Sequence, residues 1–72
     1  RNIEVNLFPN PAEDKFSISS EHNGIVQIHN LLGEIIYTAI KEKQTIEINS
    51  SQFPKGLYIV RLNTITNKIF IE

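Results

Sequence analysis

LFPNP at residues 7–11 and FPKGLYIV at residues 53–60 are the two stretches that decide the fold. The two prolines of the first stretch fix φ at their own positions and bias Phe8 and Asn10 towards extended backbone. That geometry ends one apolar strand at a sharp turn. In the second stretch Gly56 supplies the positive φ of a tight entry into the next strand. Both stretches therefore predict β-strands bounded by turns.

Apolar and polar residues alternate along most of the chain, which is the period of strands with one buried face. Turn residues interrupt this pattern at short intervals. The pattern predicts seven strands, at roughly residues 3–8, 14–19, 24–30, 34–40, 44–48, 57–63 and 67–72. We expect the core to contain Ile3, Val5, Leu7, Phe16, Ile18, Val26, Ile28, Ile46, Ile48, Tyr58, Val60, Leu62, Ile69 and Ile71. This spacing favours an all-β fold, a small seven-stranded antiparallel β-sandwich of the immunoglobulin-like type.

Three features leave alternatives open. Residues 31–36 also fit a helical stripe, but Gly33 would cost about 1 kcal/mol inside a helix. We therefore expect a hairpin with Gly33 at a positive-φ turn position. Phe8 and Phe70 break the polar alternation of their strands, so they face either the second sheet or a partner, and we expect the core. Tyr37 could lie on the outside.

Length and composition limit the organisation of the chain. Its 72 residues make one domain, residues 1–72, that buries only about 60% of its unfolded surface. There is no cysteine, so neither a disulfide nor a thiolate zinc site can form. No apolar run is long enough for a transmembrane helix. The chain begins at Arg1 and contains no methionine, so we expect a fragment of a larger protein.

The net charge of −1 gives no reason to expect a nucleic-acid partner. The two halves differ, however: residues 1–36 have a net charge of −3 and residues 37–72 of +2. Ordinary solvated strand faces explain this difference. A basic C-terminal edge that meets an acidic receptor is the sharper interpretation.

No constellation of residues points to catalysis, a cofactor or a metal. Glu13 and Asp14 would face opposite sides of a strand, or else lie in a turn as a weak cation site. His22 and His29 have no second ligand or nucleophile at a suitable spacing, and we expect them at the surface. We therefore expect no enzyme activity and no cofactor. Tyr58 alternates with core residues, so its ring is expected inside and its hydroxyl at the rim.

Four pieces of the sequence, in order, resemble one known family. They are LFPNP at 7–11 with DKFSI at 14–18, VQIHNLLGEIIY at 26–37, the stretch 48–60 with FPKGLY at 53–58, and KIFI at 68–71. The chain resembles, over its full length, the type A C-terminal sorting domain of the type IX secretion system, the Por secretion system family of Bacteroidota. It departs from the usual family ending in closing with Glu72.

The resemblance implies a C-terminal sorting signal that directs an attached cargo through the outer membrane. The implied partners are the upstream cargo domain, the outer-membrane translocon with its shuttle proteins, and a sortase-like cysteine peptidase that removes the domain after export. The implied location is the periplasm in transit, then the cell surface or the medium. The residues carried over as recognition or turn positions are Pro9, Asn10, Pro11, Gly33, Pro54, Gly56, Tyr58 and Lys68.

Lys68 leads the terminal strand, which a receptor could contact by strand addition or through charge. The alternative function is an immunoglobulin-like accessory module that binds carbohydrate or a partner protein. Such a module would present a flat aromatic or polar face, for which Tyr37 and Tyr58 are the candidates.

Overall fold

A computed structural model describes residues 4–72 of the chain and contains seven β-strands in that range. Ile3, the first residue of the predicted core and of the first predicted strand, lies outside the described residues. Among residues 4–72 no helix is long and apolar enough to cross a membrane. The strands are β1 (Asn6–Phe8), β2 (Lys15–Ser19), β3 (Gly24–His29), β4 (Ile35–Lys41), β5 (Thr45–Asn49), β6 (Gly56–Leu62) and β7 (Ile65–Ile71).

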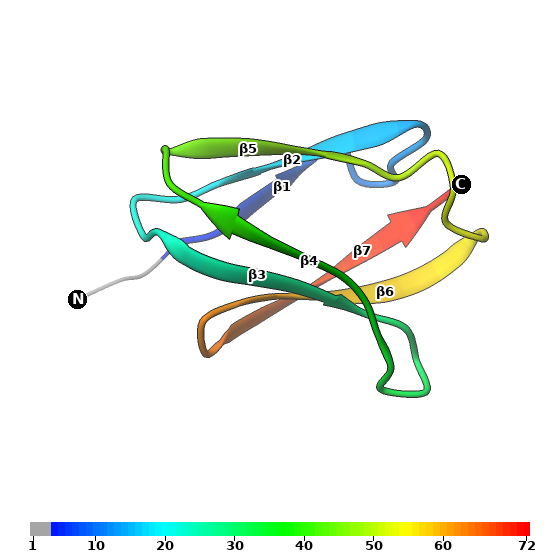
Figure 1. The fold of residues 1–72 in the computed structure, drawn as a ribbon. Coiled ribbons are helices and arrows are strands. Elements are labelled where there is room, and N and C mark those ends of the chain that lie inside the picture. The colour runs from blue at the N-terminus through cyan, green and yellow to red at the C-terminus, as the bar shows by residue number, and fades with distance from the viewer. Residues whose placement is uncertain (1–3) are drawn as a thin grey trace.

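The strands form two antiparallel sheets that pack face to face (Figure 1). A three-stranded sheet has the order β1-β2-β5, and a four-stranded sheet has the order β4-β3-β6-β7. The connections after β2, β4 and β5 cross from one sheet to the other, as in immunoglobulin-like sandwiches. The all-β sandwich predicted from the alternation is therefore confirmed.

The core lies between the sheets and is built from every second residue of each strand. Phe16 and Ile18 of β2 face Val26 and Ile28 of β3, with one or no per cent of each side chain exposed. Val5, Leu7 and Ile46 are half-buried and pack against this core. The alternation rule was sufficient here because each sheet buries only one face. The buried apolar residues are Ala12, Phe16, Ile18, Val26, Ile28, Ile48, Tyr58, Val60, Leu62, Ile69 and Ile71.

The prediction that Phe8 and Phe70 lie in the core is wrong. Phe8 is 49% exposed and Phe70 is 45% exposed. Phe70 stands between Ile69 and Ile71, which are both buried, so the two-residue period of the strand turns its ring outward. Tyr37, by contrast, is half-buried against the core, so the suggestion that it lies outside is also wrong.

The segment 31–36 forms a hairpin, as expected. β3 ends at His29 and β4 begins at Ile35, with a bulge in their pairing between Ile28 and His29. Gly33 has a φ of 86°, so the predicted positive-φ turn position is confirmed. The last hairpin is tighter than predicted. Only Asn63 and Thr64 separate β6 from β7, and β7 therefore starts at Ile65.

Candidate functional site

The topology brings the predicted recognition residues to one end of the sandwich. The connections β1–β2, β3–β4 and β5–β6 and the C-terminus all lie at that end, and the connections β2–β3, β4–β5 and β6–β7 lie at the other (Figure 1). Seven of the eight residues belong to these connections or to the first three residues of β6. They are Pro9, Asn10, Pro11, Gly33, Pro54, Gly56 and Tyr58, while Lys68 lies within β7.

The Pro-Asn-Pro turn lies along the free edge of β7. The Asn10 side-chain amide donates to the Lys68 carbonyl over 3.4 Å, and its oxygen accepts from the Phe70 amide over 3.2 Å. Ala12 continues this pairing, because its N–H donates to the Phe70 carbonyl over 2.7 Å and its carbonyl accepts from Glu72 over 2.7 Å. The peptide bonds before Pro9 and Pro11 are both cis. Through the hydrogen bonds of Asn10 and Ala12, the turn acts as a cap on the edge of the last strand.

This cap changes the interpretation of the terminal strand. Strand addition needs unpaired backbone N–H and C=O groups at a sheet edge. Those groups in residues 68–72 are already bonded to Asn10 and Ala12. A partner could add a strand there only by displacing the turn. The Lys68 side chain is exposed, so contact through its charge requires no displacement.

Tyr58 and Pro54 form a structural bond rather than a binding platform. The Tyr58 hydroxyl donates to the Pro54 carbonyl, across the connection that leads into β6. A tyrosine at this position that bonds back to upstream backbone is the tyrosine corner of immunoglobulin-like sandwiches. The Tyr58 ring is buried and lies 5.8 Å, centroid to centroid, from Phe53, which lies 6.1 Å from Tyr37. The prediction of a buried ring with a rim hydroxyl is confirmed. Gly56 has a φ of 147°, so it also has the positive φ expected of it.

Asn30 organises the β3–β4 hairpin, and sequence reasoning did not single it out. Its side-chain oxygen accepts from the amides of Leu32 and Glu34 over 2.9 and 3.0 Å. Its side-chain N–H donates to the Glu34 carboxylate over 2.8 Å. This local bonding is typical of asparagine in turns and fixes the hairpin around Gly33. The spacing Asn-x-x-Gly was the signal that could have identified it.

Lys41 is the second residue that sequence reasoning missed. The residue is 1% exposed, although it follows directly after the strand predicted at residues 34–40. Its ammonium group donates to the Ser20 carbonyl over 2.7 Å, to the His22 carbonyl over 2.9 Å and to the Asn23 side-chain oxygen over 3.0 Å. Burial lowers the pKa of this ammonium group below its ordinary value of 10.5. All three acceptors are neutral oxygens of the β2–β3 loop. The three hydrogen bonds therefore attach this loop to the end of β4.

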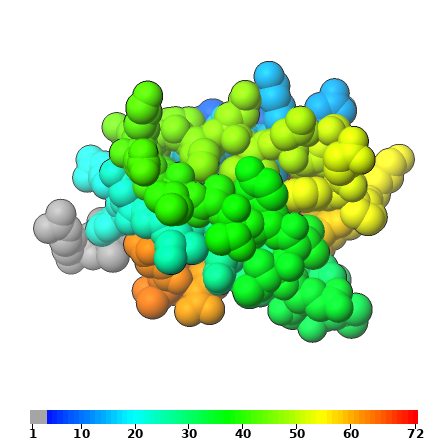
Figure 2. Space-filling view, in the orientation of Figure 1, coloured from blue at the N-terminus to red at the C-terminus, as the bar shows by residue number. Residues whose placement is uncertain are grey.

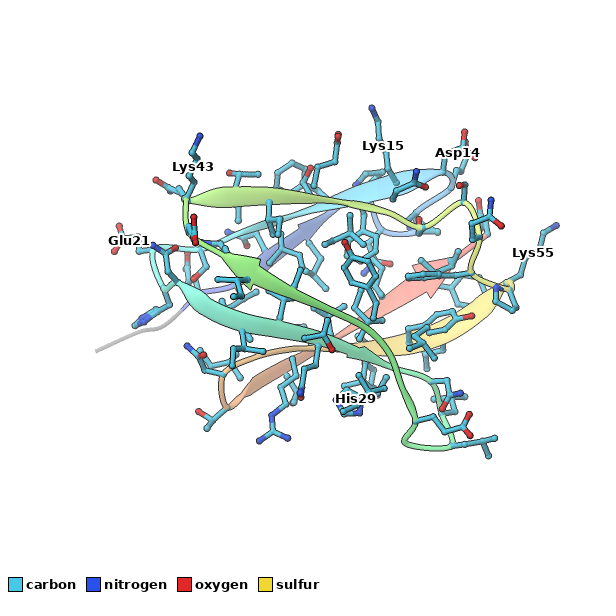
Figure 3. The ribbon with its side chains drawn as sticks, viewed as in Figure 1. Asp14, Lys15, Glu21, His29, Lys43 and Lys55 are labelled. Atoms are coloured by element: carbon cyan, nitrogen blue, oxygen red, sulfur yellow. The ribbon has the colours of Figure 1, made fainter. Side chains whose placement is uncertain are left out.

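The remaining candidates do not form a reactive site. Glu13 and Asp14 are both exposed, and no group of three or more potential ligands among residues 4–72 could hold a metal ion. His29 lies on the outer face of the four-stranded sheet, as expected, but it is half-buried rather than fully at the surface. Its side chain projects away from the three-stranded sheet (Figure 3).

Comparison with known proteins gives one family and two relatives. Residues 6–72 match the family described as "Secretion system C-terminal sorting domain". The chain is 36% identical over 69 residues to the ulvan lyase NLR42 of Nonlabens ulvanivorans, and 37% identical over 67 residues to an endo-acting ulvan lyase of Formosa agariphila. These alignments cover 92% and 89% of this chain but only 13% of each relative. No solved structure matches the chain.

Proposed function

The chain belongs to the family of C-terminal sorting domains of the type IX secretion system, and we propose from this premise that residues 1–72 are one folded address label on a larger cargo protein. The observation that carries the proposal is the extent of the match, because residues 6–72 include all seven strands. What is recognised would then be a complete sandwich rather than a short linear peptide. The chain spans only 13% of the length of the relatives, which fits a small module on a larger protein.

The proposed route starts in the periplasm and ends at the cell surface or in the medium. The partners would be the outer-membrane translocon and its shuttle proteins. A sortase-like cysteine peptidase would then remove the domain after export. In this scheme the chain is the substrate of the export machinery, and any catalysis belongs to the cargo or to the peptidase.

The carried-over residues would have two different roles. Pro9, Asn10 and Pro11 cap β7, and Tyr58 closes the corner before β6, so these residues would keep the recognised end in one conformation. Gly33 and Gly56 would do the same through their turns. Lys68 is exposed, and its side chain is the member of the set most suited to direct contact with a partner.

A fusion experiment tests the proposal. Residues 1–72 are attached to the C-terminus of a periplasmic fluorescent reporter in a bacterium with a type IX system. We expect the reporter in the medium or on the cell surface. It should stay in the periplasm when the domain is absent, and also when the strain lacks the translocon.

Periplasmic retention of a folded fusion in the competent strain would contradict the proposal. The accessory-module reading, with carbohydrate or a partner protein as ligand, would then take its place. Export that persists without the translocon would contradict the type IX route specifically.

A further inference from the structure

The two outer faces of the sandwich differ in chemistry. On the three-stranded sheet the outward residues are polar, with Phe8 as the exception, and include Ser17, Ser19 and Thr45. This is the usual composition of a solvated sheet face. The charged pair on this face is internally neutralised, because Lys15 lies 3.4 Å from Glu47.

The outer face of the four-stranded sheet carries apolar side chains on either side of a polar row, which consists of Thr38, Gln27, Arg61 and Thr66. Ile25 and Ile40 are paired across β3 and β4 and are 52% and 66% exposed. Leu57 and Phe70 are paired across β6 and β7 at the opposite end of the face. Exposed apolar patches that are flanked by polar residues in this way mark interaction sites. We call this surface the docking face; its apolar residues are Ile25, Ile35, Ile40, Leu57, Ile59 and Phe70.

The charges on the docking face have one sign. Arg61 and Lys68 are the charged strand residues that point outward from this sheet, and neither has a carboxylate within ion-pair distance among residues 4–72. The Arg61 guanidinium donates through Nε to the Asn63 carbonyl over 2.8 Å, which holds the side chain on the face. The face is therefore cationic as well as apolar.

The middle of the docking face is hollowed. An open hollow of about 310 Å³ is lined by His29, Ile59, Arg61 and Thr66, together with Leu31 and Gly33 of the adjoining hairpin. Figure 3 shows His29 projecting on this side of the sheet. Figure 2 shows the edge strand β4 and the adjoining hairpin, in green, across the front of the molecule. A side chain from a partner can enter the hollow beside the Arg61 guanidinium.

We propose that the docking face binds a protein of the export machinery through a surface that is apolar and carries carboxylates opposite Arg61 and Lys68. Charge complementarity selects this partner. Pairing with the same face of a second copy of the chain would place two further cations, and no carboxylate, opposite Arg61 and Lys68. The identity of the partner as export machinery rests on the proposed function; the surface and its chemistry do not.

Two double variants with the same change in net charge test the role of the cations. R61E/K68E reverses both charges on the docking face. K43E/K55E reverses two exposed lysines outside it, both of which point away from this sheet in Figure 3. Urea unfolding of each fusion protein verifies that both variants keep the wild-type stability. Should R61E/K68E fail that check, the milder R61Q/K68Q takes its place beside K43Q/K55Q.

A photo-crosslinking amino acid then reports contact in living cells that carry the reporter fusion. It is placed at Thr38 on the docking face or at Thr45 on the opposite face, both of which are exposed. We expect a protein adduct from Thr38 and none from Thr45. R61E/K68E should lower its yield about tenfold, and K43E/K55E should leave it within about twofold. The crosslinked segment of the partner should combine apolar side chains with Asp or Glu.

The other outcomes overturn the proposal. They are equal adduct yields from both positions, no adduct at all, and an adduct yield that R61E/K68E leaves unchanged. An adduct with a second copy of the fusion or with lipid would also overturn it. Export of the wild-type reporter is scored in the same cells. Export without the Thr38 adduct would reject the docking face alone, and the adduct without export would reject the proposed function alone.

Discussion

At the scale of single residues, Lys41 is the clearest departure from what its sequence context predicts. Lys41-Glu42-Lys43 is typical of a solvated turn, yet Lys41 ends β4 on an inward-facing position of the strand. The two-residue period already places it there, because it follows Tyr37 and Ala39. What the period cannot show is that the β2–β3 loop supplies three oxygens around that position.

Replacing Lys41 with methionine should destabilise the domain. The substitution keeps the length of the side chain but leaves three oxygens without their donor, at a cost of about 2–3 kcal/mol. The free energy of unfolding, measured with urea, is the test. Lys43→Met is the control, because Lys43 is exposed and its loss should change stability by less than about 0.5 kcal/mol. Equal effects of the two substitutions would contradict the structural role of Lys41.

The lowered pKa of Lys41 predicts a particular dependence of stability on pH. In the unfolded chain the Lys41 ammonium group has its ordinary pKa of 10.5, whereas in the folded chain it loses its proton at a lower pH. In that window the unfolded state binds more protons, so stability should rise with pH through this group. The difference in unfolding free energy between wild type and Lys41→Met should therefore grow from neutral pH towards 10.5. A difference that stays flat or shrinks would reject the direction of the shift.

At the scale of strands and turns, the alternation pattern predicted the existence of every strand. It succeeded because each sheet buries only one face, so apolar and polar side chains alternate along each strand. Its errors at Phe8 and Phe70 come from giving hydrophobicity more weight than period. Both residues stand at outward positions of otherwise regular strands, and the period was the better guide.

The capped edge of β7 could not be predicted from the sequence. The Pro-Asn-Pro turn was correctly expected to end the first strand. Its second role depends on a contact between Asn10 and residues about 60 positions later, and no local pattern encodes such a contact. The same holds for the sheet order, which sets which strands become edges.

Asn10→Ala should loosen the edge of β7 without unfolding the domain. The substitution removes the bond to the Phe70 amide, which should then exchange its hydrogen about fivefold faster, in line with a net loss of about 1 kcal/mol. Hydrogen exchange followed by NMR measures this directly. Asn6→Ala, at an exposed position of β1, should leave the exchange of Phe70 unchanged. Unaltered exchange of Phe70 in Asn10→Ala would show that the cap is not maintained in solution.

At the scale of the whole molecule, the last strand serves both the interior and the surface. Ile69 and Ile71 are buried in the core, whereas Lys68 and Phe70 point outward between them. The sequence alone could separate the inward-facing from the outward-facing residues of this strand. It could not show in which sheet the strand lies, and therefore on which outer face Phe70 stands. That assignment turns an isolated exposed aromatic residue into one end of the docking face.

Deletion of residues 68–72 should abolish cooperative unfolding. It removes Ile69 and Ile71 from the core, at a cost of about 2–5 kcal/mol each, and leaves Asn10 and Ala12 without partners. A domain of this size has about 3–5 kcal/mol from its core to lose. Thermal unfolding followed by circular dichroism is the measurement. A cooperative transition in the deletion variant, within a few degrees of wild type, would show that β7 is dispensable for the fold.

The matched variant K68S/F70S/E72S changes only outward or terminal positions of the same segment and should keep the cooperative transition. This pair matters for any study of export, because loss of secretion in the deletion variant would follow from unfolding alone. Loss of secretion in the folded triple variant would instead follow from the change in the exposed side chains. Recognition by the export machinery is therefore tested on the side chains of β7 that face outward, with the buried row left intact.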